Sequence, residues 1–137
     1  MILCFICIYS TFPDNFLYAQ PTLTKLTLRG CGLDDARCAR VLPAVAASCP
    51  GLRDLDLSGN GLTDAGMADL VATLLQSDSV RLRRLDLGGN KFKAEGLRTL
   101  ATALQANVWL EALDLSDAGV DQRSLESFFA MLLARLI

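Results

Sequence analysis

Histidine is absent from the 137 residues of the sequence, and tryptophan occurs only once. Without histidine, the chain lacks the Ser-His-Asp triad, the Cys-His pair and the histidine-containing zinc sites. The sequence also has no nucleophile motif, and nothing in it brings two of its carboxylates to a defined separation. We therefore predict that the protein is not an enzyme and has no catalytic residue, metal ion, cofactor or small-molecule substrate.

Strong net charge and long hydrophobic runs are also absent. The net charge is −2 at pH 7, so the composition does not favour nucleic acid or an anionic membrane as a partner. The apolar run from Ile2 to Tyr9 is too short to span a bilayer. We predict that residues 1–20 are an apolar extension or an irregular cap. A secretory signal cut after Ala19 stays an alternative, although no Lys or Arg precedes the run.

A disulfide framework is missing as well. The five cysteines are Cys4, Cys7, Cys31, Cys38 and Cys49. Their odd number and their spacing match no known framework, and Cys4-x-x-Cys7 is half of a zinc-ligand pattern without a second pair. Free thiols in a reducing compartment are the simpler interpretation. We therefore expect the chain in the cytoplasm or the nucleus, with secretion through the weak N-terminal signal as the alternative.

What the sequence does contain is a repeat. Four blocks follow the spacing L-x-x-L-x-L-x-x-N/C-x-L, and their opening leucines, 29, 30 and 28 residues apart, are Leu23, Leu52, Leu82 and Leu110. The period of two in each front half predicts a strand, and apolar residues four apart in each back half predict a helix. Residues 21–137 are thus expected to form one repeat domain, in which Pro43 kinks the first helix or marks its true start.

Two local features refine this prediction. A buried amide at Asn60 and Asn90 would bond to backbone groups of the turn and form a ladder through stacked repeats. Ala118 occupies the same position in the fourth block and has no such group, so that repeat is expected to be irregular. Asp64 and Asp121 suit helix N-caps or first turns, where acids meet exposed N–H groups.

The pattern resembles the leucine-rich-repeat family, and its period and helical back half are similar to the ribonuclease-inhibitor-like class. That class includes repeats of NOD-like receptors, tropomodulin and Ran GTPase-activating protein. The blocks LRDLDLSGNGLTDAGMADLVATL and LGGNKFKAEGLRTLATAL are also similar to repeats of tonsoku-like proteins. The resemblance implies an α/β fold, a right-handed solenoid of about four repeats with parallel strands on its concave face and helices on its convex face.

The resemblance also implies function. It favours a protein-interaction module that binds through the concave strands, as a whole protein or as a fragment of a larger scaffold or receptor. A GTPase-activating or other regulatory repeat protein is the alternative.

Side chains between the strand leucines face outward, and strands lie about 4.8 Å apart, so equivalent positions form rows. The positions predicted to contact a partner are Lys25, Thr27, Arg29, Arg53, Asp54, Asp56, Arg84, Asp86 and Asp114.

Aspartates form the sharpest of these rows. They are Asp56, Asp86 and Asp114. Repulsion between like charges raises the pKa of carboxyl groups, and a partner protein with a basic segment would relieve it. The alternative interpretation is that the row is ordinary repeat consensus, whose charge is compensated by Arg53, Arg83 and Arg84.

The C-terminal segment from Phe128 to Ile137 is unusually apolar. A solenoid needs a polar cap over its last repeat, and Leu133 and Leu136 are expected to lie uncovered. Either the chain is a fragment of a longer solenoid, or this helix pairs with a partner or with a second copy. The single tryptophan, Trp109, precedes the fourth strand and is expected to pack against the convex edge rather than to anchor a partner.

Overall fold

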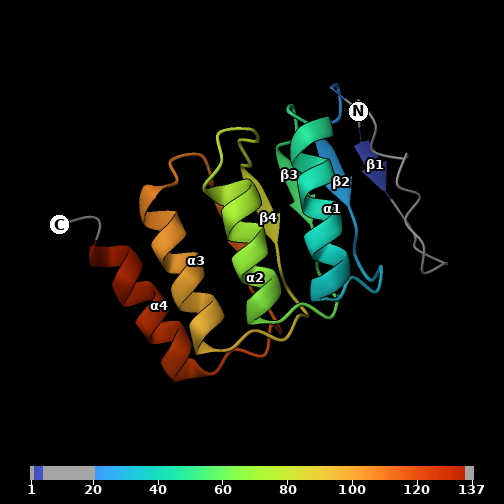
Figure 1. The fold of residues 1–137 in the computed structure, drawn as a ribbon. Helices are drawn as coiled ribbons and strands as arrows, with labels where there is room; N and C mark the ends of the chain where they lie inside the picture. Colours follow the sequence, from blue (N-terminus) through green and yellow to red (C-terminus); the bar gives the residue numbers. More distant parts are fainter. Residues whose placement is uncertain (1, 5–20, 135–137) are drawn as a thin grey trace.

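Repeating strand–helix units lie side by side along one direction of the molecule (Figure 1). This computed structural model describes residues 2–4 and 21–134. The strands are β1 (Ile2–Cys4), β2 (Lys25–Thr27), β3 (Asp54–Asp56), β4 (Arg84–Asp86) and β5 (Ala112–Asp114). The helices are α1 (Asp35–Ser48), α2 (Asp64–Leu70) with its π-helical continuation η1 (Val71–Leu75), α3 (Ala94–Ala106) and α4 (Gln122–Ala134).

The strands form one parallel sheet in the order β1-β2-β3-β4-β5, and the helices line one face of it (Figure 1). This arrangement confirms the predicted leucine-rich-repeat solenoid, with each of the strands β2 to β5 followed by its own helix. β1 adds a strand ahead of the four predicted ones, with Ile2 opposite Lys25. Residues 5–20, which include the candidate signal cleavage point, lie outside the described residues.

The strand leucines are aligned from one repeat to the next. Leu26 lies opposite Leu55, Leu55 opposite Leu85, and Leu85 opposite Leu113. The first three of these leucines are at most 2% exposed, whereas Leu113 is only partly buried. The alignment puts every leucine of this column on the core side, and it therefore places the residues that flank each leucine on the opposite face of the sheet.

Two buried asparagines form the predicted ladder. Asn60 accepts the N–H of Leu33 through Oδ1 at 3.0 Å, and its Nδ2 donates to the carbonyls of Leu28 and Leu57 at 3.0 and 2.8 Å. Asn90 makes the equivalent contacts one repeat further along. Each amide thus bonds to backbone groups of its own repeat and of the preceding one, which ties neighbouring turns together.

The fourth repeat replaces this side chain with backbone. The carbonyl of Ala118 accepts the N–H of Phe92 at 2.9 Å, in the role that the Asn90 side chain has for Leu62. The turn that presents this carbonyl contains Asp117 at φ 52°, which is the one non-glycine residue with positive φ in the described part of the chain. The expected irregularity is confirmed, and it supplies a substitute for the missing amide.

The first and last helices are capped by their own repeats. Oδ1 of Asp34 accepts the N–H of Arg37 at 2.9 Å at the start of α1. Oδ1 of Asp121 accepts the N–H of Ser124 at 2.7 Å at the start of α4, as predicted for an N-cap. The hydrogen bond from the Ser124 backbone lowers the pKa of Asp121 below its ordinary value, because it favours the charged carboxylate.

The middle helices are capped by the preceding repeat instead. The N-cap residues Thr63 and Lys93 make no side-chain cap of their own. Oδ1 of Asp35 accepts the N–H of Thr63, and Oδ1 of Asp64 accepts the N–H of Lys93, both at 2.8 Å. Asp64 therefore lies in the first turn of α2, as predicted, but its carboxylate serves α3. Gly96 makes room for it, since a Cβ there would collide with Oδ1 of Asp64.

The expectation that Pro43 marks the start of the first helix is wrong. α1 begins at Asp35, and Pro43 lies inside it on the exposed side. The start is set by the Asp34 cap, which satisfies an N–H that a helix end leaves without a partner. Pro43 has no N–H to donate to the carbonyl of Ala39, so α1 continues without that bond.

Cys38 and Cys49 are core residues with unoxidised side chains. Burial raises the pKa of both thiols, to about 12 for Cys38, because the charged thiolate is poorly solvated there. Both side chains are therefore protonated at neutral pH and behave as small apolar residues. This agrees with the free thiols that were expected, while Cys7 lies outside the described residues.

Candidate protein-binding face

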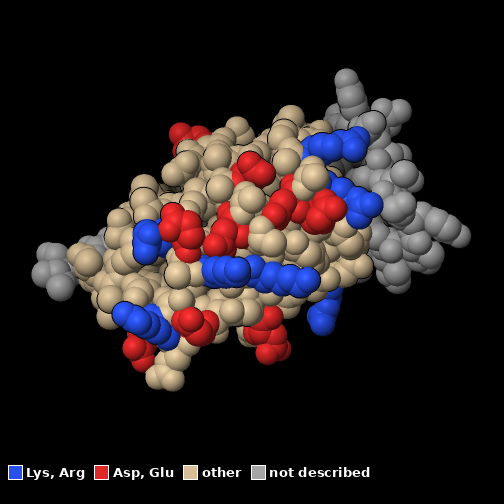
Figure 2. All heavy atoms as spheres, turned by 60° about the horizontal axis from the view of Figure 1, so that its bottom comes forward, with Lys and Arg blue, Asp and Glu red and all other residues tan. Residues whose placement is uncertain are grey.

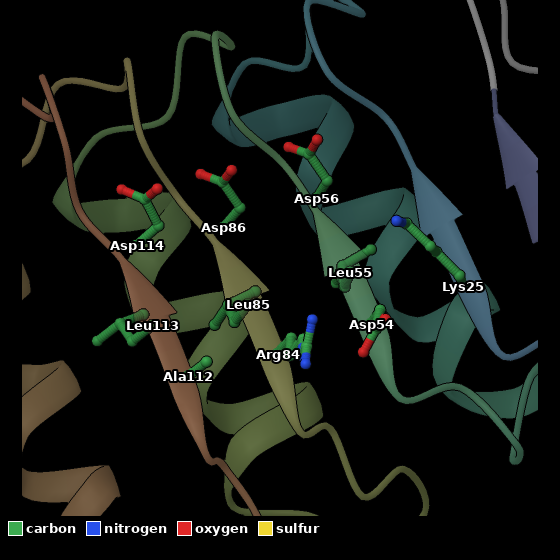
Figure 3. Close-up of a pocket in the computed structure, with 10 residues that line it drawn as sticks. All are labelled: Lys25, Asp54, Leu55, Asp56, Arg84, Leu85, Asp86, Ala112, Leu113 and Asp114. Atoms are coloured by element: carbon green, nitrogen blue, oxygen red, sulfur yellow. The ribbon is translucent and has the colours of Figure 1, made fainter.

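The face of the sheet opposite the helices is hollowed. A cavity of about 300 Å³ runs across four strands, β2 to β5 (Figure 3). Its lining residues are Lys25, Asp54, Leu55, Asp56, Arg84, Leu85, Asp86, Ala112, Leu113 and Asp114. The close-up shows the three leucines in a central line, with one row of residues on either side. The cavity therefore brings together six of the nine predicted contact positions.

The two rows differ in charge. The aspartate row consists of Asp56, Asp86 and Asp114, which lie opposite one another at the C-terminal ends of β3, β4 and β5. The mixed row consists of Lys25, Asp54, Arg84 and Ala112 at the N-terminal ends of β2 to β5. In the view of Figure 2, acidic groups likewise form a band beside a row of Lys and Arg. A partner across this sheet would meet both signs of charge.

Each carboxylate of the aspartate row is held by the turn that follows it. Oδ1 of Asp56 accepts the N–H of Ser58 at 2.9 Å, and Oδ1 of Asp86 accepts that of Gly88 at 2.9 Å. Asp114 accepts the N–H of Ser116 at 2.8 Å. These bonds fix the direction of the carboxylates, and they give the repeated aspartate a structural role beside any role in binding.

Hydrogen bonds set the pKa of Asp114. Repulsion along the row taken alone would raise this pKa, but hydrogen bonds from Ser116 lower it below the ordinary value. The side chain of Asp114 is exposed, so water screens the neighbouring carboxylates, while a hydrogen bond at contact distance still favours the ionised form. At neutral pH this end of the aspartate row is therefore charged.

The arginines do not neutralise the aspartate row at close range, contrary to the alternative interpretation. Arg53 donates to the carbonyls of Pro50 and Leu52, and Arg83 lies 3.8 Å from the carboxylate of Glu111. Among residues 21–134, no ion pair within 4.0 Å joins Arg84 or either of these arginines to the row. The negative charge of the row is thus available to a partner.

Three predicted contact positions lie at the margin of the cavity. Thr27 continues the line of the aspartate row into β2, where it is half-buried. Arg29 is exposed just beyond the end of β2. Arg53 precedes β3 and is bonded to nearby carbonyls. These residues extend the face beyond the cavity, and a partner would contact them only if it also extends beyond the cavity.

Trp109 was not predicted to anchor a partner, yet it lies partly in solvent. Its side chain is 40% exposed, and the guanidinium carbon of Arg81 lies 4.4 Å from the centre of its ring. Arg81 lies three positions before the start of β4, and Trp109 lies three positions before the start of β5. The contact between Arg81 and Trp109 could have been predicted from the sequence, because equivalent positions in adjacent repeats become neighbours in the fold.

The end of the solenoid at α4 is less covered than its interior. Phe129 is 53% exposed and Leu133 is 58% exposed, and Phe128 is the only buried residue of the described part of α4. The expectation that Leu133 lies uncovered is confirmed, whereas Leu136 falls outside the described residues. An exposed apolar surface of this kind is typical of interfaces.

In residues 2–4 and 21–134, none of the helices is both long enough and apolar enough to cross a membrane. This part also has no group of three or more Cys, Asp or Glu residues arranged to hold a metal ion.

Known proteins share this architecture. The family described as Leucine Rich repeat matches residues 48–71 and 81–101. A ribonuclease inhibitor of Sus scrofa is 44% identical over 94 residues, which are 69% of this chain and 20% of that protein. The human NACHT, LRR and PYD domains-containing protein 12 is 35% identical over 103 residues, 75% of this chain and 10% of that protein. The chain thus spans about a fifth or less of these relatives.

A solved structure agrees with the fold. The tropomodulin C-terminal domain of Caenorhabditis elegans superposes with a TM-score of 0.61 at 20% identity, over 85% of this chain and 68% of that one. At this identity the likeness concerns the fold alone. Together with the aligned leucines, the asparagine ladder and the family match, these findings identify the chain: it belongs to the leucine-rich-repeat family, with repeats of the ribonuclease-inhibitor-like class.

Proposed function

We propose that the chain is a protein-interaction module that binds a basic segment of a partner protein across the concave face of its sheet. The observation that carries this proposal is the aspartate row: three carboxylates from adjacent strands, in register, beside a cavity of about 300 Å³. Strands lie about 4.8 Å apart, so a partner that crosses them meets a negative charge at each step. Lys or Arg side chains from an extended or helical segment fit this pattern.

The turn hydrogen bonds favour binding. They hold the carboxylates of Asp56, Asp86 and Asp114 in place before a partner arrives. A side chain that is already ordered loses less conformational entropy on association. The relatives support a protein as the partner, because two of them are ribonuclease inhibitors, a name that states action on another protein.

The test compares the wild type with the triple variant Asp56→Asn, Asp86→Asn and Asp114→Asn in affinity capture from a cell extract. Asparagine keeps an oxygen for the turn hydrogen bonds and removes the charge. The control carries the same loss of charge away from the sheet, through Asp69→Asn, Asp78→Asn and Glu126→Gln. We expect the triple variant alone to lose a set of basic partners. Equal capture by all three proteins would refute the proposal.

Self-association through α4 is a second candidate, favoured by the exposure of Phe129 and Leu133. Two copies that join through this helix would bury both side chains. Light scattering across a range of concentrations would then show a dimer that Phe129→Asp or Leu133→Asp disrupts. A wild-type chain that stays monomeric up to high concentration would exclude this candidate.

We also propose that the module works in the cytoplasm or the nucleus. The support is chemical, because Cys38 and Cys49 are buried thiols, and free cysteines are typical of reducing compartments. Expression of the chain with a C-terminal fluorescent tag tests this. Fluorescence in the cytosol or nucleus is expected, and tagged protein in the culture medium would contradict it.

A further inference from the structure

The segment that connects α3 to β5 is rigid and presents an aromatic ring. Oδ1 of Asn107 accepts the N–H groups of Trp109 and Leu110, both at 2.9 Å. Nδ2 of the same side chain donates to the carbonyl of Leu75 at 3.0 Å, at the end of the preceding repeat's helix. One asparagine therefore fixes the backbone on both sides of the tryptophan and ties it to the repeat before it.

The ring itself is held from one side. Arg81 stacks on it with its guanidinium carbon 4.4 Å from the ring centre, while 40% of Trp109 remains accessible. Val108 beside it is 69% exposed. Tryptophan and arginine are the residue types that most often dominate binding energy at protein interfaces. A ring that is already ordered costs little entropy when a partner covers it.

The surroundings of this ring are basic. The N-terminal rim comprises the first residue of each of the strands β2 to β5 and the three residues that precede it. Its charged residues are Lys25, Arg53, Arg81, Arg83, Arg84, Asp54 and Glu111. Five cations against two anions give the rim a net charge of +3, whereas the whole chain has −2. The charge of Glu111 is partly compensated by Arg83, whose Nε lies 3.8 Å from Oε1 of Glu111.

We propose that Trp109 and Arg81 form a second anchor on the N-terminal rim, and that this anchor takes an acidic segment of a partner protein carrying an apolar side chain. The apolar side chain covers Trp109 and Val108, and the carboxylates pair with the rim arginines. Arg81 serves both purposes, since one guanidinium stacks on the ring and keeps its edge for hydrogen bonds to a carboxylate. The anchor lies at the N-terminal ends of the strands, whereas the aspartate row lies at their C-terminal ends, and it selects the opposite charge. It therefore goes beyond the function proposed above, although Lys25, Asp54 and Arg84 of the rim also line the cavity.

The test is a random peptide library displayed on phage and selected against the full chain. We expect the enriched peptides to combine Asp or Glu with aliphatic or aromatic residues. Synthetic versions without tryptophan are then titrated while the emission of Trp109 is followed, because Trp109 is the only tryptophan of the chain. Binding is expected to shift this emission. A selection that enriches no peptides of this acidic and apolar kind overturns the proposal, whether or not basic peptides are also selected by the aspartate row.

The affinity of each variant for the peptide, measured by isothermal titration calorimetry, shows where the peptide binds. Trp109→Ala is expected to weaken binding by about tenfold or more and Arg81→Ala by about fivefold, as for other interface anchors. Arg123→Ala removes an exposed arginine of α4 and is expected to change nothing. The Asp56→Asn, Asp86→Asn and Asp114→Asn variant is also expected to bind normally, which separates this site from the aspartate row. Undiminished binding by Trp109→Ala overturns the proposal.

Discussion

The inner repeats and the last repeat follow one sequence pattern but differ in how well they are covered. Leu55 and Leu85 of the inner strands are 2% exposed, whereas the equivalent Leu113 of β5 is only partly buried. On the helices, Ala101 of α3 is fully buried, and Phe129 at the equivalent position of α4 is 53% exposed. A repeat in a solenoid buries its core only against neighbours on both sides, so identical residues contribute differently according to position.

The hydrogen bonds differ in the same way. The inner turns are bonded through the side chains of Asn60 and Asn90, which reach into the preceding repeat. The last turn uses the carbonyl of Ala118, and α4 is capped by its own Asp121 rather than by the repeat before it. The asparagine bonds between repeats thus lie in the turns that follow β3 and β4, the strands that also carry the centre of the candidate face.

The largest expected contrast is in the core. Leu85→Ala is expected to lower the free energy of unfolding by about 2–5 kcal/mol, because it leaves a cavity in a fully covered column. Leu113→Ala removes the same atoms from a partly exposed position and is expected to cost about half as much. Urea denaturation followed by circular dichroism measures both. Equal losses would mean that the last repeat is as well covered as the others.

The next contrast concerns the ladder. Asn90→Ala leaves the buried N–H of Leu62 and the carbonyl of Leu87 without the Asn90 amide that bonds to them, and is expected to cost about 2–3 kcal/mol. Ala118→Asn is expected to bring no comparable gain, since the carbonyl of Ala118 already accepts the N–H of Phe92. The same denaturation curves test this. If Ala118→Asn raised the free energy of unfolding by as much as Asn90→Ala lowers it, the carbonyl of Ala118 would not replace the asparagine amide in the fourth turn.

A smaller effect is expected where one repeat caps the next. Gly96→Ala places a Cβ against Oδ1 of Asp64 and is expected to destabilise the protein by about 1–3 kcal/mol. The loss should shrink when Gly96→Ala is made together with Asp64→Ala, because the collision is then removed. A double-mutant cycle measures this coupling. Strictly additive losses would mean that Asp64 is not what restricts position 96.

The smallest expected effect is an acid dependence at the last helix. The folded pKa of Asp121 is lowered below its ordinary value of 3.8, so its charge stabilises the folded state above that pH. This contribution is lost as the pH falls through the lower, folded pKa. Asp121→Asn keeps the capping oxygen but not the charge, and its unfolding midpoint should depend less on pH below about 4. Parallel pH profiles for wild type and variant would show that the charge contributes nothing.

The period of the sequence was enough to predict the stacked strands and the ladder, because leucines and asparagines recur at the same distance in each block. It was not enough to predict the caps. Asp64 looks like a cap for its own helix, and only the spatial neighbourhood of Lys93 reveals that it serves the next one. Of the two alternatives for Pro43, the one that placed the start of the first helix there is wrong, because the cap at Asp34 sets that start.

The candidate face was predictable in position but not in detail. Register follows from the repeat, so Asp56, Asp86 and Asp114 were correctly expected to lie in a row. The pKa of Asp114 depends on a turn hydrogen bond that the spacing of leucines does not contain. The exposure of Trp109 depends on how it packs beside Arg81, which is a property of the three-dimensional structure.

The most direct test of a concave binding face is a map of backbone amide shifts, recorded by nuclear magnetic resonance as a captured partner is added. The chain is 14.8 kDa, which suits this method. The shifts are expected to concentrate in β3, β4 and β5 and in the turns that follow them, around Ser58, Gly88 and Ser116. Shifts confined to the outer surfaces of α1, α2 and α3 would contradict the account.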